Sequence, residues 1–257
     1  MSSNTPFLIG VIRSQEKELL ADDEYTRLIN APSAQEALHV LTETPYGRWL
    51  EEAIDTPAAM AALGHRLAEA KAWLLEQLES ASARLFIEAR STSLAAAAAA
   101  LDDDEAAPTA VWQEAGDQLA TQLTAAAETP LQRQVAQLTA DRARFDTQLR
   151  ATQPPADLAE TVRQLEAAGY AGFTLDMLEA LTAQRDATAY EKQWDEVLLT
   201  LLRQHAADVV GDDAVLAYWY VLELEVKQLR LLLSAKLQGV ETDQLAGLKR
   251  SLFRERV

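Results

Sequence analysis

Residues 6–50 read PFLIGVIRSQEKELLADDEYTRLINAPSAQEALHVLTETPYGRWL and are the most informative part of the sequence. It predicts three helices with short breaks between them, followed by the aromatic pair Tyr46 and Trp49. Ser33 and Glu36 have the spacing of a capping box, which starts the third helix. A series of capped helices with no alternating apolar pattern indicates an all-α fold.

The remaining sequence continues this helical pattern. Only 9 glycines and 8 prolines interrupt 257 residues, so helix is favoured almost everywhere. One long helix is predicted from Pro57 to about Leu101, where the acidic run 102–105 ends it. A second long segment is predicted from Thr109 to Leu149, with a restart at Thr129-Pro130. The two long segments can pair as a coiled-coil-like hairpin or an extended bundle.

Three parts are predicted along the chain. An N-terminal helical module with its long helix occupies residues 1–105, connecting long helices occupy 106–155, and a C-terminal helical module occupies 156–257. In the last part a long helix ends at Gly239, which suits a left-handed helix cap. A weak internal repeat relates residues 33–50 to 174–194, since each capped helix leads to a tyrosine and then a tryptophan. We therefore expect an elongated multi-helix assembly of repeated modules.

Composition excludes several classes of function. The net charge of −17 argues against nucleic-acid binding and against direct docking on anionic lipid, because both need basic surface. The chain has no cysteine, and its longest uncharged apolar run, 94–101, is far shorter than the ~20 residues of a membrane span. We expect a cytoplasmic protein that reaches a membrane only through other subunits, with no direct membrane insertion.

No catalytic, cofactor or metal site is predicted. His39, His65 and His205 are dispersed, and no phosphate-binding loop or nucleophile elbow is present. Glu36 and His39 have the E-x-x-H spacing of di-iron bundles, but those bundles need a second such pair. A capping glutamate beside a surface histidine is the favoured interpretation, and a di-iron enzyme is a distant alternative.

The predicted helix that ends at Gly239 carries three further ionisable residues. Glu225, Arg230 and Lys236 interrupt an otherwise apolar pattern. Periodicity alone favours the polar face of an amphipathic helix for all three. An interface role is the other interpretation.

The sequence resembles one family at both ends, the C subunit of archaeal and bacterial A/V-type ATPases, called subunit d in the eukaryotic complex. Its N-terminal pattern Y-x-x-A-R-x-R-x-x-E-x-x-L-L, its pattern P-S-x-x-E-A-x-x-x-L-x-x-T-x-Y and its C-terminal pattern E-x-x-N-L-R-x-x-x-x-G-K-x-x-G are each partly matched. The matching positions are Arg13, Glu16, Leu19, Leu20, Pro32, Ser33, Glu36, Ala37, Leu41, Thr44, Tyr46, Glu225, Leu229, Arg230, Lys236 and Gly239. The departures are Phe7, Val11, Gln228 and Ala235. The chain is identified as a shortened or divergent bacterial-type member.

The resemblance implies a fold, a function and partners. It implies a funnel-like piece in the central rotor of a V/A-type ATPase, without catalysis of its own, used for ion or proton transport. Its partners would be the central-shaft subunits and the membrane proteolipid ring. Seven residues become candidate structural or interface positions: Arg13, Glu36, Tyr46, Trp49, Glu225, Arg230 and Lys236. The alternative is a helical scaffold or coiled-coil adaptor unrelated to ATPases, which shares the apolar stripes and the charge.

Overall fold

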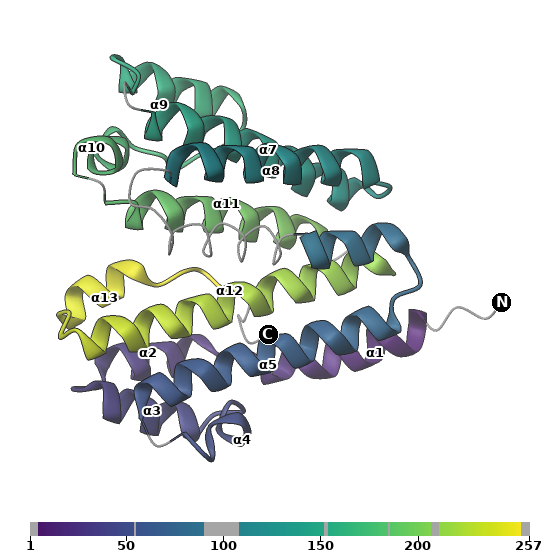
Figure 1. The fold of residues 1–257 in the computed structure, drawn as a ribbon. Coiled ribbons are helices and arrows are strands. Elements are labelled where there is room, and N and C mark those ends of the chain that lie inside the picture. The colour runs from purple at the N-terminus through teal and green to yellow at the C-terminus, as the bar shows by residue number, and fades with distance from the viewer. Residues whose placement is uncertain are drawn as a thin grey trace. The chain divides into compact units, whose positions relative to one another are not determined.

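The structure, a computed structural model, describes residues 5–53, 55–89, 108–151, 154–184, 186–206 and 211–252. Throughout these ranges the regular elements are helices and there is no strand, so the predicted all-α class is confirmed (Figure 1). The predicted apolar run 94–101, the acidic run 102–105 and the predicted boundary at 105 lie outside the described residues. No helix among the described residues is long and apolar enough to cross a membrane.

The chain divides into two compact units. The first unit comprises Met1–Leu78 and Ala206–Val257, and the second comprises Glu79–His205. The predicted three-part division of the chain stays a prediction.

The first unit begins with short helices. They are α1 (Thr5–Gln15), the 3-10 helix η1 (Glu16–Glu18), α2 (Asp22–Asn30), α3 (Ala34–Thr42) and α4 (Gly47–Leu50). The Ser33 hydroxyl accepts a hydrogen bond of 3.1 Å from the Glu36 backbone N–H, which is the Ser33 half of the predicted capping box. Gly47 is required for space, since a Cβ there would lie 2.2 Å from the Thr42 carbonyl oxygen.

Two long helices complete the first unit. They are α5 (Thr56–Gln77) and α12 (Asp212–Leu237), followed by α13 (Thr242–Leu248). The α12 helix packs against α1, α3, α5 and α13 and is buried along most of its length. A helix that is apolar nearly all round belongs in a core, and α12 is that core.

The end of α12 agrees with the predicted cap. Gly239 has a φ of +76°, and its N–H donates to the Lys236 carbonyl oxygen at 3.1 Å. The Val240 N–H donates to the Ala235 carbonyl oxygen at 3.0 Å, which completes a Schellman motif. The sequence therefore fixes where this helix stops.

Among its described residues, the second unit contains a helix at residues 81–89 and five further helices. They are α7 (Pro108–Ala126), α8 (Pro130–Arg150), α9 (Leu158–Ala167), α10 (Leu175–Ala183) and α11 (Thr188–Ala206). The predicted second long segment turns at Thr129, and α7 packs against α8. The Thr129 hydroxyl accepts from the Gln132 N–H, and the Gln132 side chain accepts from the Thr129 N–H, each at 3.1 Å. This capping box places the turn between the two helices.

The single long helix predicted from Pro57 to about Leu101 is wrong. The α5 helix ends at Gln77, because Leu78 adopts an extended backbone with a ψ of 124°. The Ser80 hydroxyl then accepts from the Ala83 N–H at 3.1 Å and caps the helix at residues 81–89. A serine N-cap without glycine or proline is a weak stop signal, which explains the wrong prediction.

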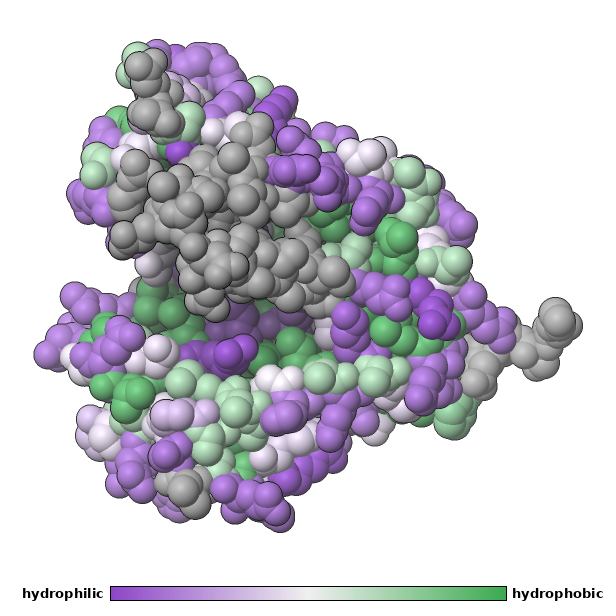
Figure 2. Space-filling model, in the orientation of Figure 1, coloured by the Kyte–Doolittle hydropathy of each residue, from purple (hydrophilic) through white to green (hydrophobic). Residues whose placement is uncertain are grey.

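The exposed side of α5 is unusual in composition. Ala61, Ala68 and Ala72 are exposed there, beside Glu69 and Glu76. Figure 2 shows the corresponding pale, weakly apolar residues along α5 among hydrophilic ones. Small side chains leave the helix backbone close to its surface.

Candidate functional site

Glu225 is the centre of a buried polar network in the first unit. Its side chain is 1% exposed on α12. Its two carboxylate oxygens accept from the Leu20 backbone N–H at 3.2 and 3.1 Å. One of them also accepts from the Tyr46 hydroxyl at 2.5 Å. A single side chain therefore connects α12 to the link after η1 and to the segment before α4.

Arg66 on α5 supplies positive charge to the same network. Its guanidinium carbon lies 3.8 Å from the ring centroid of Tyr46 and 4.5 Å from that of Trp49. The side chain is 3% exposed, and its two terminal nitrogens have no hydrogen-bond partner among the described residues. Arg66 is thus held mainly by the faces of two aromatic rings, in a cation–π arrangement. Its charge acts on Glu225 without a direct hydrogen bond.

Sequence reasoning missed Arg66. In the sequence Arg66 follows Leu63 by three positions and directly precedes Leu67, so it lies on an apolar side of the predicted long helix. A charged residue inside such a stripe is a usable signal, because arginine is rarely fully buried without a specific reason.

Burial dominates the electrostatics at Glu225. Desolvation raises the pKa of Glu225 to about 7, although the Tyr46 hydrogen bond, the Arg66 charge and the Leu20 N–H each lower it. Burial also raises the pKa of Tyr46 and of Tyr25 well above the usual range, with the Glu225 charge adding to the effect. The tyrosines remain protonated, and the carboxyl group is the member of this network that titrates near neutral pH.

Trp49 joins this network to the surface. The Arg48 guanidinium carbon lies 3.7 Å from the Trp49 ring centroid, and Arg48 also pairs with Glu18 at 2.6 Å. The Trp49 and Tyr46 ring centroids are 6.1 Å apart. The predicted aromatic pair is therefore packed between two arginines, one buried and one exposed.

Lys236 serves a separate contact in the same unit. Its ammonium donates to the carbonyl oxygens of Ile29 at 2.9 Å and Ala31 at 2.5 Å. These carbonyls lie at the C-terminal end of α2, where a cation is favoured by the helix dipole. Partial burial lowers the pKa of Lys236. Lys236 thus holds α2 to the end of α12.

The other three candidate residues lie on the surface. Arg13 pairs with Glu16 at 2.8 Å within one turn. Glu36 is exposed at the start of α3, and Arg230 is the exposed member of the α12 candidates. The structure therefore brings together Tyr46, Trp49 and Glu225 around Arg66, while Lys236 lies near α2. The interface roles of all seven residues stay predictions.

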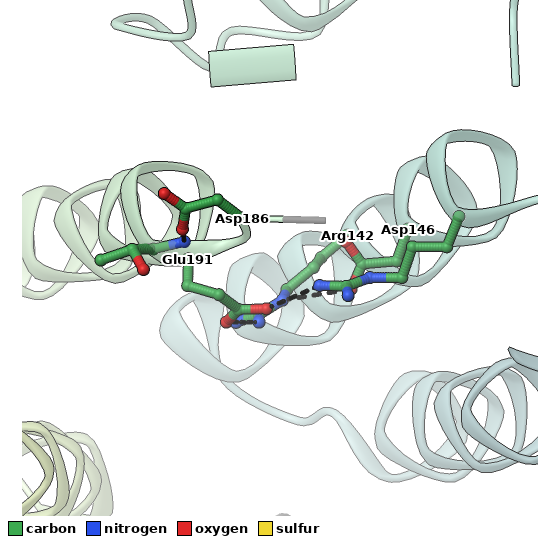
Figure 3. A network of polar contacts seen from close by, with 6 residues as sticks. Arg142, Asp146, Asp186 and Glu191 are labelled. Atoms are coloured by element: carbon green, nitrogen blue, oxygen red, sulfur yellow. Dashed lines mark hydrogen bonds and ion pairs between the residues drawn. The ribbon is translucent and has the colours of Figure 1, made fainter. Parts of the chain in front are cut away.

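The second unit has a polar network of its own, shown in Figure 3. Arg142 on α8 contacts Glu191 on α11 and lies 3.6 Å from Asp146. Arg150 pairs with Glu191 at 3.1 Å, and the Asp186 carboxylate accepts from the Thr188 N–H at 2.9 Å at the start of α11. Glu191 thus joins two arginines of α8 to the first turn of α11.

Burial and charge compete in this network. Burial lowers the pKa of Arg142, but the carboxylates of Glu191 and Asp146 raise it above its ordinary value. Burial raises the pKa of Asp146, against the opposing charge of Arg142. The arginines are charged at any physiological pH, so this network acts as a fixed ion-pair cluster.

Aromatic side chains pack beside it. The rings of Phe145, Tyr170, Phe173 and Tyr190 surround Trp194, with centroid distances between 4.9 and 6.4 Å. Tyr190 also lies near Asp146, whose charge adds to the effect of burial in raising the pKa of Tyr190. Tyr46 and Tyr190, which correspond in the predicted repeat, therefore each lie against a carboxylate from a different helix.

The described residues offer no group of three histidine, cysteine or acidic side chains that could hold a metal ion. Glu36 and His39, whose spacing suggested a di-iron bundle, are both exposed, and His39 lies 3.7 Å from Glu43. Their surroundings are those of ordinary surface residues. The buried networks have the features of ties between helices, since their charged groups contact other protein groups.

Comparison with known families gives a direct match. The model of the ATP synthase (C/AC39) subunit family matches residues 8–92. The match confirms the predicted family resemblance and includes Arg13, Tyr46, Trp49 and Arg66, while Glu225 lies outside it. No curated protein matches the chain.

Proposed function

We propose that the chain, whose residues 8–92 match the model of the ATP synthase (C/AC39) subunit family, is a non-catalytic subunit of the central rotor of a V/A-type ATPase. In this role it connects the central shaft to the membrane proteolipid ring during ion or proton transport. The family match is the observation that carries the proposal. The chain is then a cytoplasmic, peripheral protein, held at the membrane by other subunits.

A coupling subunit must transmit torque without deforming, and the first unit has features that suit this task. Its central helix α12 is packed on most sides, and close packing leaves side chains few soft degrees of freedom. Glu225 and Lys236 each hold a segment from the start of the chain to α12. These ties resist separation of the helices that lie next to one another in this unit.

The charge of the chain bears on its partners. A net charge of −17 favours partners that present basic or neutral surfaces, such as basic loops of a ring or shaft subunit. Electrostatic attraction between exposed charges weakens as salt screens it. If the affinity for these partners is the same at low and at high ionic strength, attraction between charges does not contribute to binding.

The test is reconstitution with purified partners. The full chain, carrying an affinity tag, is mixed separately with the detergent-solubilised proteolipid ring and with the central-shaft subunits of the same ATPase, then analysed by size-exclusion chromatography. We expect co-elution with both. A similarly acidic helical protein is the matched control for charge alone. Co-elution with neither partner would overturn the rotor role and favour the scaffold alternative.

A further inference from the structure

Arg66 is a buried cation whose N–H donors have no protein acceptor among the described residues. Its side chain is 3% exposed on α5, and its nitrogens Nη1 and Nη2 make no hydrogen bond there. The rings of Tyr46 and Trp49 contact it, with centroids 3.8 and 4.5 Å from the guanidinium carbon. A ring face attracts the positive charge but is a poor substitute for an oxygen acceptor. The donors of Arg66 therefore need a further acceptor, because buried polar groups are rarely left without one.

Two other buried groups in this network have unused hydrogen-bonding capacity. Tyr25 of α2 is 2% exposed, and its hydroxyl makes no hydrogen bond of good geometry with the described residues. The Glu225 carboxylate, 1% exposed on α12, accepts from the Leu20 N–H and from the Tyr46 hydroxyl. A carboxylate offers about four acceptor positions. Glu225 can therefore accept at least one more hydrogen bond.

The three groups lie in the same part of the first unit. Arg66 lies on the face of the Tyr46 ring, and the hydroxyl of that ring donates to Glu225. Burial and the Glu225 charge raise the pKa of Tyr25, while the Arg66 charge lowers it. The nitrogens of Arg66 nevertheless make no hydrogen bond with the Glu225 carboxylate. Buried polar groups that lie near one another without direct contact are often joined by a bridging group.

The chemistry of these groups limits what can bridge them. A guanidinium only donates hydrogen bonds, and an ionised carboxylate only accepts them. The bridging group must therefore accept from Arg66 and donate to Glu225. The carboxylate would repel an anion, and the guanidinium would repel a metal cation. Since the side chains of Arg66, Tyr25 and Glu225 are at most 3% exposed, the group must also be small. Water has each of these properties.

We propose that Arg66, Tyr25 and Glu225 form a binding site for ordered water, which bridges α5, α2 and α12. The water oxygen accepts from Arg66, and its hydrogen atoms go to the oxygens of Glu225 and Tyr25. Buried water in globular proteins makes about three such bonds to polar groups that have no other partner. The bridge is compatible with either charge state of Glu225, because a neutral carboxyl group can donate its own O–H to water.

The bridge gives Arg66 a structural role that goes beyond the proposed rotor function. A buried guanidinium whose donors lack acceptors would destabilise the first unit. Bound water removes this cost and connects α5 to the carboxylate that already holds Leu20 and Tyr46. Three long-range ties would then meet at Glu225, two direct and one through water.

A crystal structure of the full chain, at a resolution that shows ordered water, is the first test. We expect density for a water molecule within about 3.2 Å of both an Arg66 nitrogen and a Glu225 oxygen. Crystals soaked in bromide distinguish an anion from water, because bromide has an anomalous signal. A direct bond from Arg66 to a protein acceptor, an absence of density between the groups, or bromide at this position would each overturn the proposal.

Oxygen-17 magnetic relaxation dispersion is the test in solution, since it counts water molecules that stay bound for longer than the protein takes to rotate. Arg66→Met keeps an apolar side chain of similar length and removes the donors. We expect the number of long-lived water molecules to fall by at least one relative to the wild type. Arg84→Met is the matched control, because Arg84 is exposed, and it should leave the number unchanged.

A second variant keeps the solution test decisive. Tyr25→Phe removes one hydroxyl and keeps the buried ring, so it should also lower the number of long-lived water molecules. It decides the result if Arg66→Met does not fold, as judged by circular dichroism. An unchanged number in folded Arg66→Met, or in Tyr25→Phe when Arg66→Met is unfolded, would overturn the water site. None of these outcomes depends on ring or shaft binding, so the rotor role is tested separately.

Discussion

The Tyr46 hydroxyl donates a 2.5 Å hydrogen bond to the Glu225 carboxylate across 179 positions of sequence. Tyr46 lies inside the region that matches the family model, and Glu225 lies far outside it. The matched region therefore shares its core with residues that lie outside the match. The part of it that lies in the first unit packs against α12, a helix from the last fifth of the chain.

Tyr46→Phe should weaken the first unit. The substitution keeps the buried ring and its contact with Arg66 but removes the donor to Glu225. Losing one hydrogen bond to a buried charged group costs about 1.5–3 kcal/mol. We expect a loss of about 2 kcal/mol at pH 8, measured by urea unfolding with circular dichroism. The loss should be smaller at pH 5, where the carboxyl group is neutral. An equal loss at both pH values would mean that the charge of the Glu225 carboxylate does not strengthen its bond with Tyr46.

The stability of the first unit should fall as pH rises through neutrality. A carboxyl group with a raised pKa binds more protons in the folded state than in the unfolded state between the two pKa values, here 4.5 and about 7. Its contribution is therefore complete below pH 4.5 and is lost as pH rises through 7. The shift corresponds to about 3 kcal/mol, at about 1.4 kcal/mol per unit of pKa.

Comparison of two variants isolates this contribution. Urea unfolding between pH 5 and pH 8 should show the decrease in the wild type and in Glu223→Gln but not in Glu225→Gln. Titrating groups other than Glu223 and Glu225 are the same in all three proteins, so the difference between the profiles is the quantity to measure. Parallel profiles for the wild type and Glu225→Gln would contradict the prediction.

Glu191→Gln should destabilise the second unit. Glu191 pairs with both Arg142 and Arg150, and all three side chains are about two-thirds buried or more. Removing its charge leaves two partly buried guanidinium groups with reduced compensation, which we expect to cost about 2 kcal/mol. Glu160→Gln removes an exposed pair with Arg163 in the same unit and should change thermal stability little. Equal effects of the two substitutions would show that burial does not strengthen the Glu191 cluster.

Local signals in the sequence predicted the starts and ends of several helices. Ser33 and Thr129 cap helices through their hydroxyls, and Gly239 adopts the left-handed backbone expected after α12. Each of these features depends on residues within a few positions of one another. The end of α5 before Ser80 is not predicted from local signals, because the residues around this cap are good helix formers.

The buried networks depend on contacts that no local pattern encodes. Periodicity predicts that Glu225 and Lys236 belong to one polar face of a helix. Their partners in the structure are Tyr46, Leu20 and the carbonyls of α2, about 180 to 207 positions away. The family pattern singled out Tyr46, Glu225 and Lys236 but could not say which of them meet. Pairing across such a distance follows only from the packing of whole helices.

Arg230 is the candidate residue best placed to contact a partner. It is exposed on α12, a helix whose other sides are mostly buried in the first unit. Arg230→Glu changes the charge of this surface by two units without removing a buried contact. If Arg230 faces the ring or the shaft, affinity for that partner should fall about tenfold or more, which is about 1.4 kcal/mol. Size-exclusion binding assays at several concentrations measure the change.

Arg84→Glu is the matched control. Arg84 is an exposed arginine on the helix at residues 81–89, and its substitution changes the net charge by the same amount. A loss of binding common to both variants would indicate a general effect of the more negative chain. A loss confined to Arg230→Glu would place the contact on α12, because only the position of the charge differs. If neither variant binds more weakly than the wild type, Arg230 lies away from both partners, and the binding surface must be sought on other exposed residues, such as the alanine-rich side of α5.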